Sequence, residues 1–382
     1  MYSMAILGAG MVGSVMAEDL GADEGRRVAI VDVSKDRLAH VDARTPDNVE
    51  TIHGNCGEAS VIKSLTDEFD MIIGALPSRF GFKALERVIK AGKPYCDISF
   101  MPEDAWELDQ LAVDAGVVAL VDCGVAPGMS NLLAGLAAHL LSPCHNIDIA
   151  VGGIPRDPKP PWNYKAGFSP YDVIEEYLRP SRIVEDGQMV IKEALSEPEL
   201  LEFEELGTLE AFNTDGLRSL AETVKVPNMR ERTMRWPGHR ELALAMREAG
   251  LLDEEPVEVN GVRVVPRDVT CHQLFKAWTY EQGEADLTVM RVTGDGDLDG
   301  QPTRLTWDLL DYYDPKQDQT SMARTTAFPC TICARMIESG VINEPGVYAP
   351  ERLADRDEVL QELLKGLQDR GVIYRHTQEP LS

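Results

Sequence analysis

The length, composition and charge of the chain exclude several classes of protein. With 382 residues, 44% hydrophobic and 26% charged, it has the composition of a globular protein and the length for two domains. A formal net charge of −27 predicts repulsion from nucleic acid and from anionic membrane surfaces, so neither is an expected partner. Seven cysteines, an odd number, do not indicate a disulfide framework, and no run of about 18 apolar residues predicts a membrane span. Because a strand is predicted almost at residue 1, we expect no signal peptide, and the cysteine usage favours the reducing cytoplasm as location.

A glycine motif follows the first predicted strand. The apolar run 4–7 leads directly into Gly8-Ala9-Gly10-Met11-Val12-Gly13, which has the pattern G-x-G-x-x-G, and a helix-like segment comes next. In a dinucleotide-binding βαβ unit the first glycine allows the tight turn, the second leaves room for the pyrophosphate, and the third lets the helix pack on the strand. The helix N-terminus then offers free N–H groups to the phosphates. The motif therefore predicts a dinucleotide site that includes Gly8, Gly10, Met11, Val12 and Gly13.

Asp32 ends the next apolar run, 28–31, and indicates which dinucleotide binds. A carboxylate at this position accepts hydrogen bonds from the adenosine ribose hydroxyls and repels a 2′-phosphate. No arginine follows Asp32 directly, although Lys35 is close in sequence. The sequence therefore favours NAD over NADP.

The first 125 residues alternate short apolar runs with amphipathic segments. This alternation predicts an α/β fold with a doubly wound parallel sheet of the Rossmann type, in which ligands bind at the carboxyl ends of the strands. Loops at those ends give further candidates for cofactor contact, although each loop alone is also consistent with a simple turn. They are Asn55, Cys56, Ala75, Leu76 and Pro77. Predicted strands span 4–7, 28–31, 71–74, 95–98 and 117–121, and predicted helices span 12–20, 36–41, 59–65, 81–91 and 103–115.

Two aspartates end later strands of this predicted sheet. Asp97 would act as a general base or hold a substrate ammonium, although a helix cap or loop aspartate is an equally ordinary role. Asp122 is a second candidate, which we interpret as a brace for the connection between domains. The sequence leaves these alternatives open.

After residue 128 the pattern changes to that of an α+β domain with a mostly antiparallel sheet. A helix is predicted over 129–141 and a strand over 147–153. Residues 257–264 predict a hairpin, because Asn260-Gly261 suits a two-residue type I′ turn. A second hairpin is predicted from 287–292 and 304–310, joined by 294–300, and helices are predicted over 322–339 and 353–370. We therefore expect a Rossmann domain over 1–125, a substrate and dimerisation domain over 126–321, and a C-terminal segment, 322–382, that returns to the Rossmann domain.

Several runs of the sequence resemble the saccharopine dehydrogenase family, and the resemblance covers essentially the whole chain. The similarity is strongest to the L-lysine 6-dehydrogenase branch, on the Val-Gly-Gly-Ile-Pro and Glu-Ala-Phe-x-Thr runs. The runs that carry it are 122–129, 151–155, 160–164, 209–216, 233–239, 324–329, 340–342 and 346–350.

The resemblance implies an NAD-dependent dehydrogenase that acts on the amine of an amino acid. In the lysine 6-dehydrogenase branch the ε-amine of L-lysine is oxidised, ammonia is released, and the aldehyde cyclises to piperideine-6-carboxylate. Saccharopine reductases carry an aspartate in place of Ala126 and a Ser-Tyr-type pair in place of Ser99-Phe100, so both positions weaken the saccharopine interpretation. A saccharopine or related secondary-amine dehydrogenase remains the alternative enzyme.

Site residues in the second domain follow from the resemblance and from charge. Arg235 matches an arginine that holds a substrate carboxylate, which suits bidentate pairing by a guanidinium, although a structural ion pair is the alternative. His239 is the second candidate for proton transfer after Asp97, because its titration range suits that role. Tyr164 and Asn213 are candidate polar contacts to the substrate.

One alternative from another class is a non-catalytic NAD-binding sensor or assembly subunit. Cys330-x-x-Cys333 has redox spacing, but it lies in an apolar helical run without partner ligands, so we interpret the pair as core thiols and infer no metal. The expected partners are a small amino-acid substrate and a second copy of the chain, as a homodimer or a larger homo-oligomer.

Overall fold

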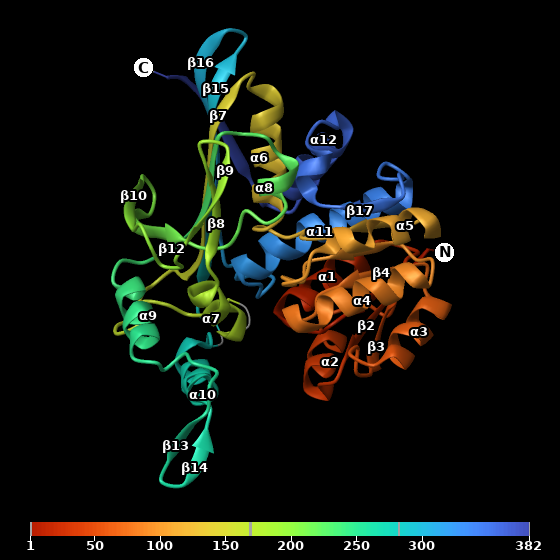
Figure 1. Cartoon of the computed structure of the whole chain (residues 1–382). Coiled ribbons are helices and arrows are strands. Elements are labelled where there is room, and N and C mark those ends of the chain that lie inside the picture. The colour runs from red at the N-terminus through yellow and green to blue at the C-terminus, as the bar shows by residue number, and fades with distance from the viewer. Residues whose placement is uncertain (1, 168–169, 282, 382) are drawn as a thin grey trace. The chain divides into compact units, whose positions relative to one another are not determined.

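The computed structural model describes residues 2–167, 170–281 and 283–381, and these form two compact units (Figure 1). Unit 1 comprises the residues up to His139 together with Ala323–Tyr374, and unit 2 comprises Leu140–Met322 with the residues from Arg375 onward. Compared with the predicted limits of 1–125, 126–321 and 322–382, unit 1 also holds almost all of helix α6 (Met129–Leu140). The last strand passes from unit 1 into unit 2.

Unit 1 is built on a seven-stranded parallel sheet in the order β17-β6-β5-β4-β1-β2-β3. Its elements in chain order are β1 (Ser3–Leu7), α1 (Met11–Gly21), β2 (Arg27–Asp32), α2 (Lys35–Asp42), β3 (Val49–His53), α3 (Ala59–Glu68), β4 (Met71–Gly74), α4 (Ser78–Lys90), β5 (Tyr95–Asp97), η1 (Ala105–Leu108), α5 (Asp109–Ala115), β6 (Val118–Leu120), α6, α11 (Ser321–Ser339), β17 (Gly346–Tyr348), η2 (Pro350–Leu353) and α12 (Asp357–Asp369).

The central strands are apolar because helices cover both faces of the sheet. Every residue of β1 and β4 is buried, which is typical of parallel strands packed on both sides. Helices α3, α4 and α5 contact one another in sequence and pack on one face over a core that includes Phe69, Leu85 and Tyr95. The prediction of a doubly wound Rossmann sheet is confirmed.

Two edge strands and the beginnings of two helices differ from the prediction. The helix predicted over 353–370 begins only at Asp357, because Leu353 ends the 3₁₀ turn η2. The sequence analysis missed β3, which is a half-exposed edge strand in which only Val49 is buried, and β17, which has three residues. The helix predicted over 103–115 is wrong in its first turn. The Asp104 carboxylate accepts a hydrogen bond from Trp106 N, so the chain begins as the 3₁₀ turn η1 and becomes α-helical only at Asp109.

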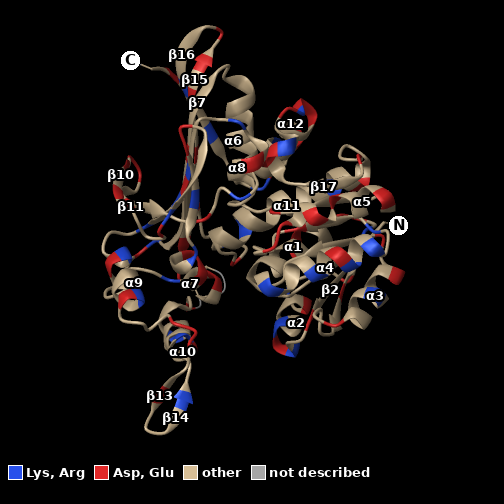
Figure 2. Ribbon diagram, viewed as in Figure 1, with Lys and Arg blue, Asp and Glu red and all other residues tan. Residues whose placement is uncertain are grey.

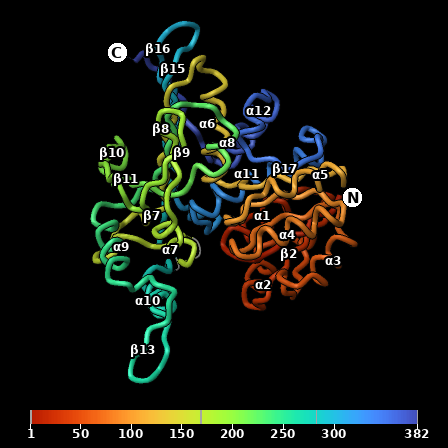
Figure 3. Tube along the Cα trace, in the orientation of Figure 1, coloured from red at the N-terminus to blue at the C-terminus, as the bar shows by residue number. Residues whose placement is uncertain are grey.

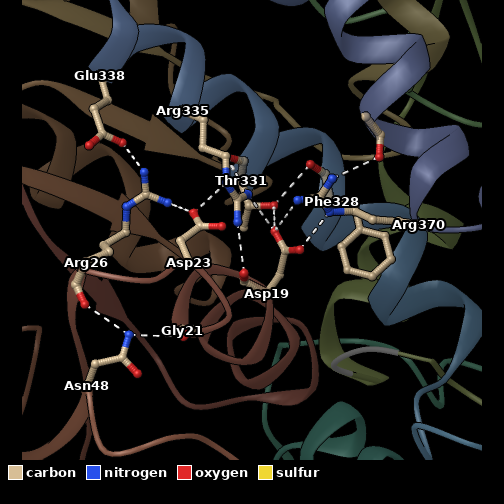
Figure 4. A network of polar contacts seen from close by, with 11 residues as sticks. Asp19, Gly21, Asp23, Arg26, Asn48, Phe328, Thr331, Arg335, Glu338 and Arg370 are labelled. Atoms are coloured by element: carbon tan, nitrogen blue, oxygen red, sulfur yellow. Dashed lines mark hydrogen bonds and ion pairs between the residues drawn. The ribbon is translucent and has the colours of Figure 1, made fainter.

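Helix α11 is fastened to α1 by a network of polar contacts around Asp19 (Figure 4). The Asp19 carboxylate accepts hydrogen bonds from Arg335 Nη1 at 2.7 Å, from Thr331 Oγ1 at 2.6 Å and from Arg370 Nε at 2.6 Å. These partners lower the pKa of Asp19 against the opposing effect of burial, which is the largest single influence on it. The network thus joins the C-terminal segment to the first helix of unit 1.

Unit 2 contains a nine-stranded mixed sheet whose main path runs β10-β11-β12-β7-β15-β16-β18, with β8 pairing β12 and β9. Strands β12 and β7 pair in parallel, whereas β10–β11, β11–β12, β12–β8, β8–β9, β7–β15 and β15–β16 pair in antiparallel register, so the prediction of a mostly antiparallel sheet is confirmed. The elements of unit 2 in chain order are β7 (Cys144–Pro155), α7 (Pro170–Leu178), β8 (Ser181–Glu185), β9 (Gln188–Lys192), β10 (Glu199–Phe203), β11 (Gly207–Asn213), α8 (Leu220–Thr223), β12 (Asn228–Arg235), α9 (His239–Glu248), β13 (Val257–Val259), β14 (Val262–Val264), α10 (Pro266–Trp278), β15 (Asp286–Leu298), β16 (Gln301–Tyr312) and β18 (Tyr374–Pro380).

The predicted hairpin at 257–264 is confirmed. Strands β13 and β14 pair in antiparallel register, and Asn260 and Gly261 have φ of 52° and 79°, as a type I′ turn requires. Figure 3 shows this hairpin extending from the rest of unit 2.

The second predicted hairpin exists, but its predicted linker, 294–300, is wrong. Strand β15 continues through this segment to Leu298, and the turn consists of Asp299 and Gly300, both with positive φ. Glycine inside the strand has a packing reason at Gly296, where a Cβ would overlap the carbonyl oxygen of Pro143. Most of the glycine-rich run 294–300 is therefore a strand that lies close to another backbone segment, and not a loop.

Charge is spread over both units. Figure 2 shows acidic residues on many elements, among them α9 in unit 2 and α12 in unit 1. Among the described residues, no helix combines the length and apolar character needed to cross a bilayer.

Candidate active site

The glycine loop of unit 1 has the backbone geometry that its sequence predicts. Gly8 has a φ of +103°, and a Cβ there would overlap the Ala75 carbonyl oxygen. A Cβ on Gly13 would overlap the Gly8 carbonyl oxygen, so the third glycine is required for α1 to lie against β1. Both glycines are thus fixed by the protein's own packing.

Gly10 differs from Gly8 and Gly13, because the protein leaves open space where its Cβ would lie. It has an ordinary φ of −75°, and a Cβ there would meet nothing within 4 Å. As the N-cap of α1 it provides no side-chain hydrogen bond, so the first N–H groups of the helix keep their capacity to bind an anion. Met11 and Val12, the first helical residues, carry two of those N–H groups. An open glycine before an uncapped helix fits a pyrophosphate.

Asp32 lies at the end of β2 and is held in place by backbone N–H groups. Its Oδ2 accepts a hydrogen bond from Ala9 N at 2.8 Å, and its Oδ1 accepts one from Ser34 N at 2.7 Å. Arg37, which the sequence analysis did not consider, places its Nη1 3.8 Å from Asp32 Oδ2. The ribose end of the site therefore contains both a carboxylate and an exposed guanidinium.

The other predicted cofactor residues surround the same loop to different degrees. The Asn55 side chain is exposed and bonds locally to Gly57 N and Glu58. The Cys56 thiol is buried, which raises its pKa to about 12, so Cys56 can meet a cofactor through its backbone only. Ala75 backs Gly8, Leu76 is half-buried, and Pro77 is the exposed N-cap of α4.

Asp97 is enclosed within unit 1. Its side chain is fully buried, and Oδ1 accepts hydrogen bonds from Ser99 N at 3.0 Å and from Ser99 Oγ at 2.7 Å. Burial raises the pKa of Asp97 to about 6, although the bonds from Ser99 oppose this effect. A Cβ on Gly74 would overlap both Asp97 Oδ1 and Tyr95 Oη, so the carboxyl and the phenol are neighbours over a glycine. This enclosure favours the loop-bracing role of Asp97, and its role as a base stays a prediction.

A second cluster of buried polar groups surrounds Arg235 in unit 2. Arg235 ends β12 with its side chain 3% exposed. Its guanidinium donates to Glu176 Oε2 at 3.1 Å, to Tyr177 Oη at 3.3 Å and to the Met234 carbonyl at 3.0 Å. The guanidinium carbon also lies 4.7 Å from the ring centroid of Tyr164, a cation–π distance. We call these residues, with His239, the Arg235 cluster.

His239 is linked to Arg235 through Tyr177. Because a carbonyl only accepts hydrogen bonds, His239 Nδ1, 2.9 Å from the Trp162 carbonyl, carries the proton. Nε2 is then the acceptor for the Tyr177 hydroxyl at 2.8 Å, and that hydroxyl oxygen accepts from Arg235 Nε. Burial, together with the charge of Arg235, lowers the pKa of His239 to about 3, so the ring is neutral. His239 is fully buried and positions other groups; its predicted proton-transfer role stays a prediction.

Two carboxyl groups of this region were missed by the sequence analysis. Burial raises the pKa of Glu176 to about 7 and that of Glu231 to about 8, and the charge of Arg235 opposes both effects. Glu231 accepts a hydrogen bond from Thr214 at 2.8 Å. Strand alternation could have predicted the position of Glu231, because it places Glu231, Thr233 and Arg235 on one face of β12. All three residues are buried.

Asn213 is placed apart from the contacts of the Arg235 cluster. Its side-chain amide donates to Ser196 Oγ at 3.1 Å and to Glu197 Oε2 at 2.9 Å. The structure therefore brings Arg235, Tyr164 and His239 together, whereas the Asn213 amide is directed to another loop. Its contact with substrate stays a prediction.

The glycine loop on a parallel sheet defines unit 1 as a nucleotide-binding domain of the Rossmann class. Family models extend this to the whole chain: the saccharopine dehydrogenase NADP binding domain matches residues 4–120, and the saccharopine dehydrogenase C-terminal domain matches residues 124–372. The chain belongs to the saccharopine dehydrogenase family, as its sequence motifs predicted. The family is one of amino-acid dehydrogenases, so the prediction of an enzyme of this class is confirmed.

Individual relatives are similar over nearly their full length. The NADP(+)-dependent, L-glutamate-forming saccharopine dehydrogenase of Schizosaccharomyces pombe is 23% identical, with 92% of this chain and 94% of the relative covered. The corresponding enzyme of Saccharomyces cerevisiae is 21% identical, with 94% and 96% covered. A solved structure of apo histidine-tagged saccharopine dehydrogenase (L-Glu forming) from Saccharomyces cerevisiae superposes with a TM-score of 0.81 at 17% identity, covering 99% of this chain and all of that one. This last likeness concerns the fold.

Proposed function

We propose that the protein catalyses the NAD-dependent oxidative deamination of an amino acid, and that the ε-amine of L-lysine is the amine oxidised. The observation that carries the proposal is the Arg235 cluster, in which a buried guanidinium donates to the Tyr177 hydroxyl and the Glu176 carboxylate and lies over the Tyr164 ring. A guanidinium in such surroundings suits a carboxylate ligand. The departures at Ala126 and at Ser99-Phe100 from the residues of saccharopine reductases weaken the saccharopine interpretation.

The reaction balances with water as the only further reactant. The protonated amine R–CH2–NH3+, with NAD+ and water, gives the aldehyde R–CHO, ammonium, NADH and a proton. When bound, the nicotinamide supplies the hydride acceptor. The protein has to remove a proton from the amine before hydride leaves the carbon, and then to direct water at the imine carbon. Asp97, with a pKa of about 6, stays the predicted base for the first step.

The preference for NAD within this proposal rests on Asp32. A 2′-phosphate at the ribose end would lie against the Asp32 carboxylate, which the N–H groups of Ala9 and Ser34 hold in place. Arg37, 3.8 Å from Asp32, is the group through which NADP would be accommodated.

Saccharopine oxidation is the second candidate. It is favoured by the names of the relatives, which are saccharopine dehydrogenases that use NADP(+). Saccharopine also ends in an α-amino acid group, so the Arg235 cluster suits both substrates.

A substrate and cofactor screen tests the proposal. Initial rates of reduced nicotinamide formation would be measured with L-lysine, L-ornithine and saccharopine, each with NAD+ and with NADP+. The proposal expects the highest kcat/KM for L-lysine with NAD+. A higher value for saccharopine establishes the second candidate, and nucleotide binding without turnover of any amine indicates a non-catalytic NAD-binding protein.

A further inference from the structure

Hydrogen-bond donors near Arg235 outnumber their acceptors. A guanidinium has five N–H groups, and Arg235 uses three, toward Tyr177, Met234 and Glu176. The Tyr164 hydroxyl is also buried without a hydrogen-bond partner among residues 2–167, 170–281 and 283–381, and the Tyr164 ring centroid lies 4.7 Å from the Arg235 guanidinium carbon. Buried donors without acceptors are rare in native proteins, so this surplus indicates a site for an anion.

Glu176 lies beside these donors and can accept a further hydrogen bond. Its Oε2 accepts from Arg235, whereas Oε1 makes no hydrogen bond among the described residues. The Glu176 side chain is 23% exposed, against 3% for Arg235, so a ligand can reach the carboxylate. Burial raises the pKa of Glu176, and the charges of Arg235 and Arg179 oppose this effect.

We propose that Glu176 binds the α-ammonium group of the substrate while Arg235 binds the α-carboxylate. The inference rests on the proposed function and deepens it, because it assigns the Arg235 cluster to the end of the amino acid that does not react. In an α-amino acid the ammonium and the carboxylate are attached to one carbon. When Arg235 binds the substrate carboxylate, the substrate ammonium therefore lies next to the Glu176 carboxylate, which is hydrogen-bonded to the same guanidinium.

Charge explains why the pair would select this class of ligand. Glu176 and Arg235 together are neutral, and an α-amino acid headgroup is neutral as a zwitterion, so each charge of the ligand meets one opposite charge. A simple amine would leave Arg235 without a new partner, and a simple carboxylate would lie against Glu176 without compensation. The pair thus determines specificity for a free amino-acid headgroup, and the reacting amine must be a distal one.

The test uses a ligand that has the headgroup but no distal amine. Binding of L-norleucine and of hexanoate to the full chain, with NAD+ present, would be measured by calorimetry. Wild type is expected to bind L-norleucine, and Glu176→Gln to bind it about 10- to 100-fold more weakly, which is the range for a lost hydrogen bond between charged groups. Hexanoate, which lacks the ammonium, should bind no more weakly to Glu176→Gln than to wild type.

Two further variants serve as controls for the charge and the position of Glu176. Glu176→Asp retains the charge and should recover part of the L-norleucine affinity. Glu175→Gln removes the neighbouring charge of α7, which pairs with Arg267 and Arg179 instead, and should leave L-norleucine affinity unchanged. Unfolding temperatures measured for each variant separate a binding defect from a folding defect.

The results that overturn the inference differ from those that overturn the proposed function. Equal weakening of L-norleucine and hexanoate in Glu176→Gln would mean that Glu176 only neutralises Arg235, and absence of L-norleucine binding to wild type also overturns the inference. Headgroup-specific binding without turnover of any amine would leave the inference standing and remove the proposed function.

Discussion

The Tyr177 hydroxyl donates a hydrogen bond to His239 Nε2 over 2.8 Å and accepts one from Arg235 Nε. The direction of this chain follows from its far end, because the Trp162 carbonyl requires the proton to be on His239 Nδ1. A neutral histidine can therefore orient the guanidinium without exchanging a proton with solvent. The relationship makes His239 and Tyr177 positioning residues for Arg235.

Replacement of Tyr177 by phenylalanine should weaken substrate binding more than catalysis. The change removes the two hydrogen bonds that join His239 to Arg235, while the ring keeps its packing against Phe212. We expect KM for the amino acid to rise about 3- to 10-fold, with kcat nearly unchanged. This is the range for the loss of one or two hydrogen bonds. Steady-state kinetics measures this, with Tyr348→Phe in unit 1 as the control. A loss confined to kcat would assign Tyr177 to the chemical step instead.

Glu231 should make the folded chain less stable as pH rises. Burial raises the pKa of Glu231 to about 8 from an ordinary 4.5, so the unfolded chain releases this proton first. Its contribution to stability is complete below about pH 4.5 and is lost as pH rises toward 8. The variant Glu231→Gln, which can still accept from Thr214, should therefore unfold at a higher temperature than wild type at pH 8. The difference should shrink toward pH 5 in a series of thermal melts, and a constant difference at all pH values would contradict this assignment.

The second and third glycines of the loop should respond differently to alanine. A Cβ at Gly10 meets no protein atom within 4 Å, so Gly10→Ala should leave the unfolding temperature of the nucleotide-free protein unchanged and remove the stabilisation by NAD+. A Cβ at Gly13 overlaps the Gly8 carbonyl, so Gly13→Ala should lower the unfolding temperature even without nucleotide. Thermal melts with and without NAD+ distinguish the two. Retained NAD+ stabilisation in Gly10→Ala would show that no phosphate approaches this residue.

Asp19 should be important for the stability of unit 1. Asp19→Asn leaves Arg335 and Arg370 without their shared, largely buried carboxylate, and breaking such a pair costs about 3–5 kcal/mol. The exposed pair Lys63–Asp67 provides a matched control, because Asp67→Asn should cost less than about 1 kcal/mol. Urea unfolding of both variants gives the comparison. Equal effects would mean that the Asp19 network does not fasten α11 to α1.

Much of unit 1 could be predicted from sequence because its signals are local. Apolar runs that are buried on both faces, and a glycine loop whose spacing reflects backbone overlap, need no knowledge of distant residues. Edge strand β3 was missed because only Val49 is buried, so it lacks the apolar run of its neighbours. The glycines of β15 were misread because their reason, the approach of the backbone at Pro143, lies far away in sequence.

The candidate site was less predictable because its partners come from separate elements. Arg235 was found through its motif, but Glu176 and Tyr177 belong to α7, and nothing local connects that helix to β12. Arg37 was also missed, since it reaches Asp32 from the first turns of α2 rather than from the strand end. Such contacts depend on how the helices fold back on the sheet.

The most direct test of the account is the stoichiometry of products formed from L-lysine by the full chain with NAD+. NADH would be followed by absorbance, and ammonia by an independent enzymatic assay on the same sample. The account predicts equal amounts of NADH and ammonia from L-lysine, with a strong rise in KM for Arg235→Ala. No ammonia from L-lysine, together with NADH and glutamate formation from saccharopine, would contradict it.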